Sequence, residues 1–221
     1  MVAVDVVRWF NDRSRWWGDT GILHRLLQHA AYVGLALAVA VVAGTLVGVL
    51  AGRARRPARA GRRLPAVVRL AGLVGLGGIV AALHPLRPWL VVVLLGVLAT
   101  GPVAGAVADG FANVDTDALD AAEALGLSGR QRFVGVEIRC ALPSVVAGIR
   151  SAVVRLVVIT AVAAYPGLGG LGRFIVDEGR VGAMAGMTLV GVLALVADVL
   201  GALVQRWVTP IGLRAGTRAR H

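Results

Sequence analysis

Five apolar runs of about twenty residues, separated by charged segments, constrain the fold of this 221-residue chain more than any other feature. A helix needs about 20 apolar residues to cross the hydrocarbon core of a bilayer. The mean hydropathy of +0.79 and the hydrophobic share of 57% also lie outside the range of ordinary soluble domains. The sequence therefore predicts an all-α integral membrane protein with about five transmembrane helices. The predicted spans are residues 30–51, 64–83, 89–108, 142–164 and 183–204.

The placement of the arginines predicts how these spans are oriented. Short cytoplasmic loops retain positive charge. The connection 52–65 holds six arginines and no acid, and the segment after Val204 holds four arginines and no acid. Both segments are predicted to be cytoplasmic, which puts the N-terminus outside. The same alternation places residues 109–141 in the cytoplasm, although they carry six acids and three arginines.

The first 29 residues mix aromatic side chains with charged ones. Trp9, Phe10, Trp16 and Trp17 lie among arginines and aspartates. Amphipathic rings settle at headgroup depth while charges stay in water, so residues 1–29 are predicted to form an interfacial segment against membrane lipid. A disordered tail is the alternative. The first twenty residues hold no apolar stretch of signal-peptide length, so no cleaved leader is expected. Residues 30–210 are the predicted transmembrane domain and 211–221 a basic cytoplasmic tail.

Charge and residue usage argue against several function classes. The net charge of +11 is spread between apolar runs and not over one soluble face, which argues against nucleic acid as a partner. All 23 basic residues are arginines, so the lysine of a phosphate-binding loop is absent and ATP hydrolysis is expected to belong to another chain. Cys140 is the single cysteine and the histidines lack ligand spacing, so no metal or cofactor is expected. No catalytic constellation is evident, and the adjacent Asp177 and Glu178 are expected to form a solvated surface.

Gly44, Gly48 and Gly52 recur at every fourth residue of the first span. Small residues at this spacing let helix backbones approach closely, which predicts a packing face toward another helix or subunit. With 30 glycines in the chain, a chance arrangement is the alternative.

Two ionisable residues, Arg155 and Asp198, fall well inside predicted spans. Each costs about 2.5 to 3.5 kcal/mol or more in lipid unless it is paired or faces a cavity. Both are candidates for a substrate pathway, or for a structural ion pair with each other. Arg69 and Arg150 lie nearer the inner ends, where their long side chains can reach water.

A glycine-rich run follows the fourth span and begins at Pro166. Its glycines are Gly167, Gly169, Gly170 and Gly172. Their spacing formally fits a dinucleotide-binding fingerprint, but that motif requires a preceding strand, so this interpretation is rejected. The run is expected to break the helix near the outer face, in a gate or pathway region that includes Tyr165.

The segment 109–141 is too highly charged for hydrocarbon. Residues 118–127 are helix formers, and Gly126 stands where a C-cap glycine would end their helix. A second helical piece is predicted over residues 130–139. From these residues alone, an amphipathic linker on the membrane surface fits equally.

Short motifs between Val114 and Pro210 follow one another in a characteristic order. They are Asp120-Ala121-Ala122-Glu123, Gly126, then Val136, Ile138 and Arg139, Ala141-Leu142-Pro143, Ala147-Gly148-Ile149-Arg150, Ala163-Ala164-Tyr165, Gly169-Gly170-Leu171-Gly172, and Ala197-Asp198 leading to Thr209-Pro210. This order resembles permease subunits of bacterial ATP-binding-cassette (ABC) importers, and among them the glycine betaine, carnitine and choline (osmoprotectant) branch. Upstream, the resemblance consists of the general layout with Leu64-Pro65 and Pro102.

The resemblance implies a type I ABC importer permease fold in the bacterial inner membrane, with a cytoplasmic coupling helix that docks on a separate ATP-binding subunit. The coupling residues that it implies are Asp120, Ala121, Ala122, Glu123, Gly126 and Pro143. It also implies a second permease subunit, as a homodimer or heterodimer, and an extracytoplasmic substrate-binding protein. A rigid helix tied to spans at both ends can convert closure of the ATPase into rotation of those spans.

The chain departs from the family pattern at four places. Asp120 replaces a glutamate and keeps its charge. Arg139 replaces a proline, so the exit from the loop is expected to bend less. Residues 105–107 are apolar where the branch tends to be polar, and Arg155 replaces an apolar or aromatic residue. The first two departures leave the coupling loop recognisable, whereas the last two set the substrate pathway of this subunit apart from the family pattern.

Three functional hypotheses remain from the sequence. The first is a permease for osmoprotectants, and the second is a permease for methionine or another small solute, since neighbouring branches share the loop. The third is a membrane scaffold or small membrane enzyme without an ATPase partner.

Overall fold

The computed structural model describes residues 2–53, 88–165 and 167–209, and within these ranges every regular element is a helix. Four helices are long: α2 (Ile22–Arg53), α5 (Pro88–Ala112), α8 (Ile138–Val162) and α10 (Gly179–Val208). The shorter elements are α1 (Val2–Asn11), η1 (Arg13–Arg15), α6 (Thr116–Ala124), α7 (Gly129–Arg132), the π-helical turn η2 (Phe133–Glu137) and α9 (Gly172–Asp177).

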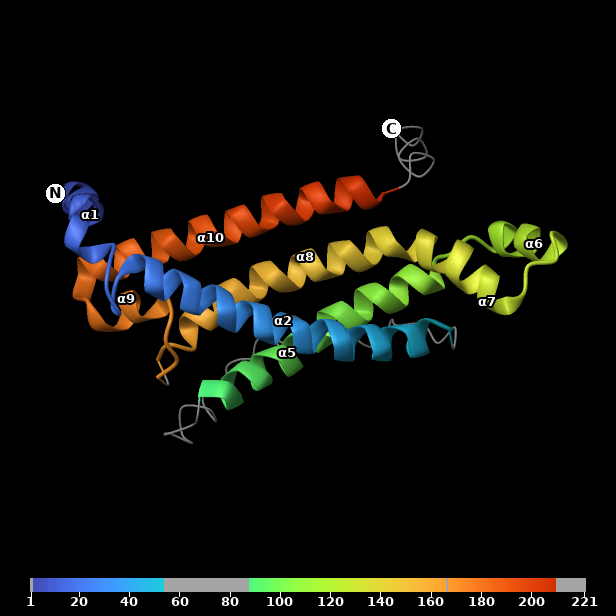
Figure 1. Cartoon of the computed structure of the whole chain (residues 1–221), viewed down its shortest axis with the longest axis horizontal. Coiled ribbons are helices and arrows are strands. Elements are labelled where there is room, and N and C mark those ends of the chain that lie inside the picture. The colour runs from blue at the N-terminus through green and yellow to red at the C-terminus, as the bar shows by residue number, and fades with distance from the viewer. Residues whose placement is uncertain (1, 54–87, 166, 210–221) are drawn as a thin grey trace.

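Four of the five predicted spans coincide with the long helices, although α8 ends two residues before the predicted end of the span 142–164. Each is long and apolar enough to cross a membrane, and the shortest, with 25 residues, extends about 37 Å against a hydrocarbon core of about 30 Å. The predicted span 64–83 and the predicted tail 211–221 lie outside the described residues. Helix α2 ends and α5 begins at opposite ends of the bundle (Figure 1), as a chain of about five spans requires.

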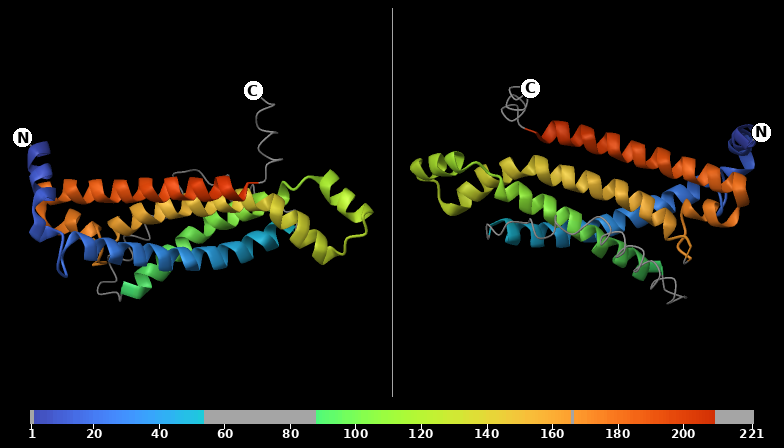
Figure 2. Two further views of the ribbon diagram at one scale, coloured as in Figure 1. Left: turned by 45° about the horizontal axis from the view of Figure 1, so that its top comes forward. Right: turned by 180° about the vertical axis from the view of Figure 1, so that it is seen from behind.

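The four long helices lie lengthwise beside one another, and the short elements gather at the two ends. Helix α2 packs on α5, α5 on α8, and α8 on α10. One end holds α1 and α9, and α1 lies across the helix axes there (Figure 1). The opposite end holds α6 and α7, and the C-terminal ends of α2 and α10 point toward it in all three views (Figures 1 and 2).

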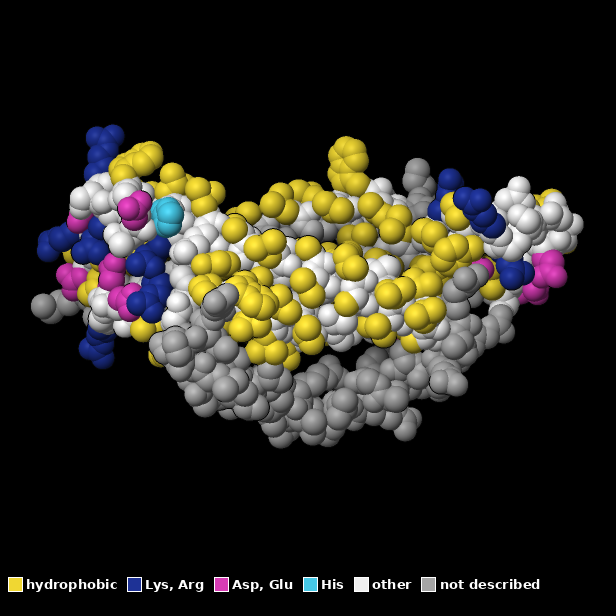
Figure 3. Space-filling view, turned by 60° about the horizontal axis from the view of Figure 1, so that its bottom comes forward, with side chains coloured by type: hydrophobic (Ala, Val, Ile, Leu, Met, Phe, Trp, Pro, Cys, Tyr) yellow, Lys and Arg dark blue, Asp and Glu magenta, His cyan; other side chains and the backbone are white. Residues whose placement is uncertain are grey.

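Charged side chains gather at these two ends. On the face shown in Figure 3, arginines and acids cluster over α1 and α9 at one end and over α6 and α7 at the other, with hydrophobic side chains between them. An apolar belt flanked by charged ends is the surface that a bilayer requires of a spanning protein.

The glycines of the first span form a seam with α5. A Cβ atom added to Gly44 would lie 2.7 Å from Val103 Cβ, and one added to Gly48 would lie 2.5 Å from Val107 Cβ. Gly52 meets Phe111 in the same way, at 2.8 Å. Such contacts are too short for any residue with a side chain, so the prediction of a packing face at these glycines is confirmed.

The core is built from small residues where α2, α5 and α8 meet. Ala36 and Ala40 of α2, Val103 and Val107 of α5 and Ala152 of α8 are fully buried. Helix α10 differs, because almost its whole apolar surface points away from this core. Its hydrophobic residues are therefore available to lipid or to another subunit.

Candidate functional site

The polar hook, residues 113–132, joins α5 to α8 and carries most of the predicted coupling residues. Asp115 begins its first helix, α6, where its side chain accepts a hydrogen bond from the Asp117 backbone N–H at 3.1 Å. A side-chain oxygen at this position satisfies an amide that the helix leaves unpaired.

Gly126 ends α6 with a φ of +74°. Its backbone N–H donates to the Glu123 carbonyl at 2.9 Å, and the Leu127 N–H donates to the Ala122 carbonyl at 3.2 Å. These two bonds form a Schellman motif, which needs a left-handed residue and therefore favours glycine. The prediction that Gly126 terminates this helix is confirmed.

The second half of the hook begins a new helix at Ser128. The Ser128 hydroxyl accepts from the Gln131 backbone N–H at 3.4 Å, and the Gln131 side chain accepts from the Ser128 backbone N–H at 2.9 Å, which is a capping box. From Gly129 the helix runs on to Val162 through α7, η2 and α8. Pro143 lies inside α8 and does not end it. We call residues 129–162 the continuous helix.

Side-chain contacts hold α6 against the continuous helix. Arg132 Nη1 donates to Glu123 Oε2 at 3.0 Å, and Arg132 Nε lies 3.7 Å from Glu137 Oε1. The rings of Phe111 and Phe133 stack with their centroids 5.7 Å apart, which joins the end of α5 to the same helix. Side-chain contacts thus attach the hook to the continuous helix, and the same helix to α5.

The predicted coupling residues divide between two faces of α6. Ala122 is buried, while Asp120, Ala121 and Glu123 are exposed. Leu125, which sequence reasoning did not single out, is 80% exposed at the tip of the hook. The outer face of α6 is therefore free to be contacted by another protein.

Asp198 of α10 pairs with Arg150 of α8, so the suggested pairing of Asp198 with Arg155 is wrong. Arg150 Nε donates to Asp198 Oδ1 at 2.7 Å and Nη2 donates to Oδ2 at 2.6 Å, a bidentate arrangement. Residues 150 and 155 differ by about 140° around the helix, so they cannot both face α10. Gly201 leaves room for the Arg150 stem, since an added Cβ would lie 2.8 Å from Arg150 Cγ. Arg150, interpreted from sequence as reaching water at the inner end, instead crosses to α10.

We expect removal of one partner of this pair to destabilise the protein more than removal of both partners. Asp198→Leu leaves a guanidinium between two spans without its carboxylate, whereas the double variant Arg150→Leu/Asp198→Leu removes both charges. In detergent, thermal unfolding monitored by size-exclusion chromatography should give a midpoint several degrees lower for the single variant than for the double one. Equal midpoints would contradict a structural pair at this position.

The glycine-rich run breaks the helix as predicted. Helix α8 ends at Val162, and Gly167 and Gly170 take positive φ values of +100° and +88° before α9 begins. Tyr165, in the turn after α8, is 68% exposed. Pro166 lies outside the described residues. The role of this region as a gate stays a prediction.

The same run lies against the first turns of α2. Gln28 Oε1 accepts a hydrogen bond from the Gly170 backbone N–H at 2.8 Å, and a side chain at Gly169 would collide with Gln28. His29, fully buried beside Gly170, has its Nε2 3.1 Å from the Val157 carbonyl of α8. The run therefore joins α2 to α8 at this end of the bundle.

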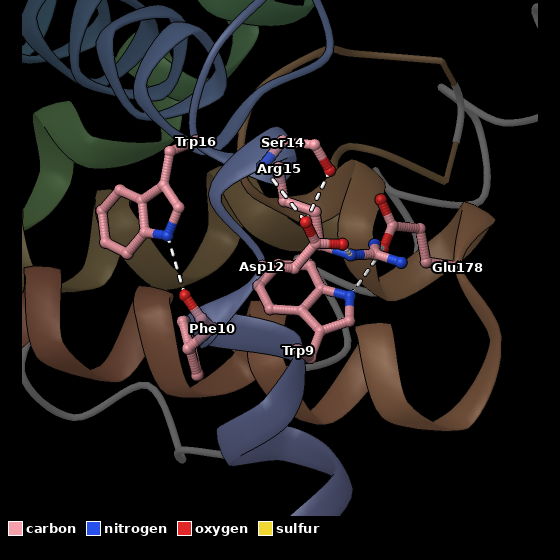
Figure 4. Close-up of polar contacts among 7 residues, drawn as sticks. All are labelled: Trp9, Phe10, Asp12, Ser14, Arg15, Trp16 and Glu178. Atoms are coloured by element: carbon pink, nitrogen blue, oxygen red, sulfur yellow. Dashed lines mark hydrogen bonds and ion pairs between the residues drawn. The ribbon is translucent and has the colours of Figure 1, made fainter.

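Glu178, at the corner between α9 and α10, receives two donors from the N-terminal segment. Trp9 Nε1 lies 3.0 Å and Arg15 Nη1 2.8 Å from the same oxygen, Oε2 (Figure 4). The Arg15 guanidinium also lies 5.1 Å from the centre of the Trp9 ring, and Phe174 meets that ring edge-on. Asp177 and Glu178 are both exposed, as expected of a solvated acidic surface, but Glu178 also holds the N-terminal segment through these two donors. Sequence reasoning missed this contact because 169 positions separate Trp9 from Glu178.

The N-terminal segment is folded against the bundle and is not a free tail. Trp9 is 7% exposed, so it contacts protein where the sequence predicted headgroups, while Trp16 and Trp17 are 41% and 69% exposed. Hydrogen bonds from the Ser14 side chain and backbone hold the pKa of Asp12 below its usual value. An open cleft of about 920 Å³ lies between α1 and the α9–α10 corner. Contact of the remaining rings with membrane lipid stays a prediction.

In the described ranges 2–53, 88–165 and 167–209, no three His, Cys, Asp or Glu side chains are grouped so that they could hold a metal ion.

Long apolar helices joined by a capped polar hook define a multi-pass membrane protein. The family described as "Binding-protein-dependent transport system inner membrane component" matches residues 20–210. The chain belongs to this family, which confirms the resemblance found in its motifs.

Three relatives have names from the osmoprotectant group. A carnitine transport permease protein of Listeria monocytogenes is 35% identical over 107 residues, which are 46% of this chain and 48% of the relative. A choline transport system permease protein of Bacillus subtilis is 32% identical over 117 residues, 51% of each chain. An osmoprotectant import permease protein of Salmonella typhimurium is 30% identical over 85% of this chain and 91% of that protein. The chain thus spans about half the length of the first two relatives.

The fold matches a solved transporter. A chain of the MetNI methionine ABC transporter in an inward-facing conformation superimposes with a TM-score of 0.68 and 22% identity, covering 86% of this chain and 96% of that one. At this identity the likeness concerns the fold alone. The predicted type I ABC importer permease fold is confirmed.

Proposed function

We propose that this chain is the permease subunit of an ATP-driven importer for osmoprotectants such as glycine betaine, carnitine or choline. The observation that carries the proposal is the polar hook, a short capped helix with an exposed face, fixed at both ends to membrane-spanning helices. The names of the relatives supply the solute class. No covalent chemistry is assigned to the chain, because its work is binding, gating and transmission of motion.

The proposed partners are an ATP-binding subunit, a second permease subunit and an extracytoplasmic substrate-binding protein. The ATP-binding subunit contacts the exposed face of α6 and hydrolyses ATP, since this chain has no lysine for a phosphate-binding loop. The largely exposed apolar surface of α10 supports a second permease copy or paralogue.

In the proposed orientation the polar hook is cytoplasmic and the N-terminus is outside. Two arginine-rich segments, 52–65 and 205–221, begin at the C-terminal ends of α2 and α10. These ends point toward the same end of the bundle as the hook (Figure 2), and cytoplasmic segments retain positive charge.

The experiment is uptake into proteoliposomes that contain this chain, the ATP-binding subunit and the second permease subunit, with the binding protein outside. We expect ATP-dependent accumulation of radiolabelled glycine betaine or choline and none without ATP. Methionine serves as the control solute, because the structural likeness to a methionine transporter concerns the fold alone.

Two results would overturn the proposal. Uptake of methionine without uptake of either quaternary amine would reassign the solute class. Failure of any ATP-binding subunit to co-purify from native membrane would favour a scaffold or a small membrane enzyme instead.

A further inference from the structure

Arg155 is an exposed arginine about two turns inside the C-terminal end of the continuous helix. It lies about 26 Å from the start of α8 at Ile138 and about 10 Å from the end at Val162. Its neighbours Leu156 and Val157 are buried against the other long helices. The guanidinium therefore points away from the core at a depth where contact with hydrocarbon is costly.

No acidic side chain of this chain neutralises Arg155. All twelve acidic residues lie within the described ranges, and inside the four long helices only Asp109 and Asp198 are acidic. Asp109 lies about 5 Å from the hook end of α5, whereas Arg155 lies about 26 Å from the hook end of α8. The two residues are therefore about 20 Å apart along the bundle, which is too far for their side chains to meet. Both carboxylate oxygens of Asp198 are bound by Arg150. A second, identical copy would bring the same set of acids, with its Asp198 equally paired.

The face that carries Arg155 is polar along part of its length. Ser144, Ser151 and Arg155 follow one another at intervals of seven and four residues, which places them on one side of the helix. Ser144 is exposed and lies beside α5, since an added Cβ on Gly110 would be 3.2 Å from Ser144 Cβ. On α5, Gly101 and Gly105 have open space around them. An arginine in hydrocarbon is costly, and the two serines in line with it supply further polar groups to this face. These three residues therefore fit a watery path better than they fit lipid.

We propose that Arg155 faces the solute pathway and binds the carboxylate of a zwitterionic solute, so that this subunit favours glycine betaine or carnitine over choline. The inference rests on the proposed function and narrows its solute class. A guanidinium offers two parallel N–H donors that fit a carboxylate. Choline has a quaternary ammonium group and no carboxylate, so the same guanidinium repels it.

The test compares glycine betaine and choline in the reconstituted importer, each at a concentration that saturates the binding protein, so that solute choice by the binding protein does not enter. Arg155→Gln should lower glycine betaine uptake about tenfold, leave choline uptake unchanged or raised, and thereby shift the uptake ratio. Arg155→Lys, which keeps the charge without the paired donors, should fall between. Arg180→Gln, which removes an exposed arginine at the start of α10, is the matched control and should leave the ratio unchanged.

A second arm separates a solute carboxylate from a lipid phosphate, the other anion that a long arginine could reach. In a Cys140→Ser background, Arg155→Cys should react with a membrane-impermeant methanethiosulfonate reagent. Adding glycine betaine together with binding protein and ATP should change the rate of this cysteine modification. A cysteine that stays unmodified lies in lipid, which would overturn the inference. If Arg155→Gln is active and keeps the wild-type ratio of glycine betaine to choline uptake, the inference about Arg155 is overturned and the proposed function stands. If the wild-type importer transports neither solute, both the inference and the proposed function are overturned.

Discussion

Gly126→Pro is expected to reduce ATP-coupled uptake at least about tenfold while the chain still inserts and folds. Gly126 holds φ at +74°, which proline cannot adopt, and its N–H donates to the Glu123 carbonyl at 2.9 Å, which proline cannot supply. The C-terminal turn of α6 would then unwind, and the proposed contact face for the ATP-binding subunit would lose its shape. Stimulation of the ATPase by liganded binding protein should fall in parallel.

Gly129→Ala is the matched control for this change. Gly129 lies three residues further along the same hook and is also exposed, with no atoms near an added Cβ, but it is helical and does not have a positive φ. Alanine fits there and slightly favours the helix. Gly126→Ala should give an intermediate loss, because the left-handed conformation costs about 1 to 2 kcal/mol for a residue with a Cβ. If Gly126→Pro transports as well as the wild type, the hook does not couple the two subunits.

Gly48→Leu is expected to prevent stable folding of the helical bundle. A Cβ on Gly48 would lie 2.5 Å from Val107 Cβ and 2.6 Å from the Ala104 carbonyl, so α2 and α5 would have to move apart. Overpacking of this kind costs typically about 1 to 3 kcal/mol and more when backbones are in contact. Monodisperse protein in detergent should be largely lost.

Gly34→Leu tests whether size alone is responsible. Gly34 lies on the same helix, and no atom lies within 4 Å of an added Cβ. Leucine there should leave the elution profile and the unfolding midpoint close to those of the wild type, because an exposed substitution of this kind is usually within about 0.5 kcal/mol. Equal losses in both variants would mean that the seam is not what holds α2 to α5.

Features with a local cause could be predicted from the sequence. Spans follow from hydrophobic length, the end of α6 follows from the glycine at position 126, and the seam follows from glycines spaced by four. Each depends on residues that are neighbours in sequence or on one helix face.

Features with a distant partner could not be predicted in this way. The Arg150–Asp198 pair depends on which side of α8 faces α10, and an uncertainty of one residue in helical phase turns a side chain by about 100°. Glu178 accepts hydrogen bonds from Trp9 and Arg15 only because α1 lies across the end of the bundle. Neither the charge pattern of residues 8–19 nor the acidic pair at 177 and 178 indicates that geometry.

Helix α8 has a mechanical consequence for the whole subunit. The continuous helix bends near the π-helical turn η2 (Figure 2), so only the 25 residues of α8 are taken as a rod, about 37 Å long. This rod touches α5 at Gly148, where Ala106 comes too close for any side chain. If the rod pivots at that contact, its arms are about 15 Å and 21 Å long. A tilt of about 10° then displaces the hook end of α8 by about 3 Å and the far tip, beside the glycine-rich run, by about 4 Å in the opposite direction. A push at the hook end of α8 therefore arrives at the opposite end of the bundle without loss of amplitude and with its direction reversed.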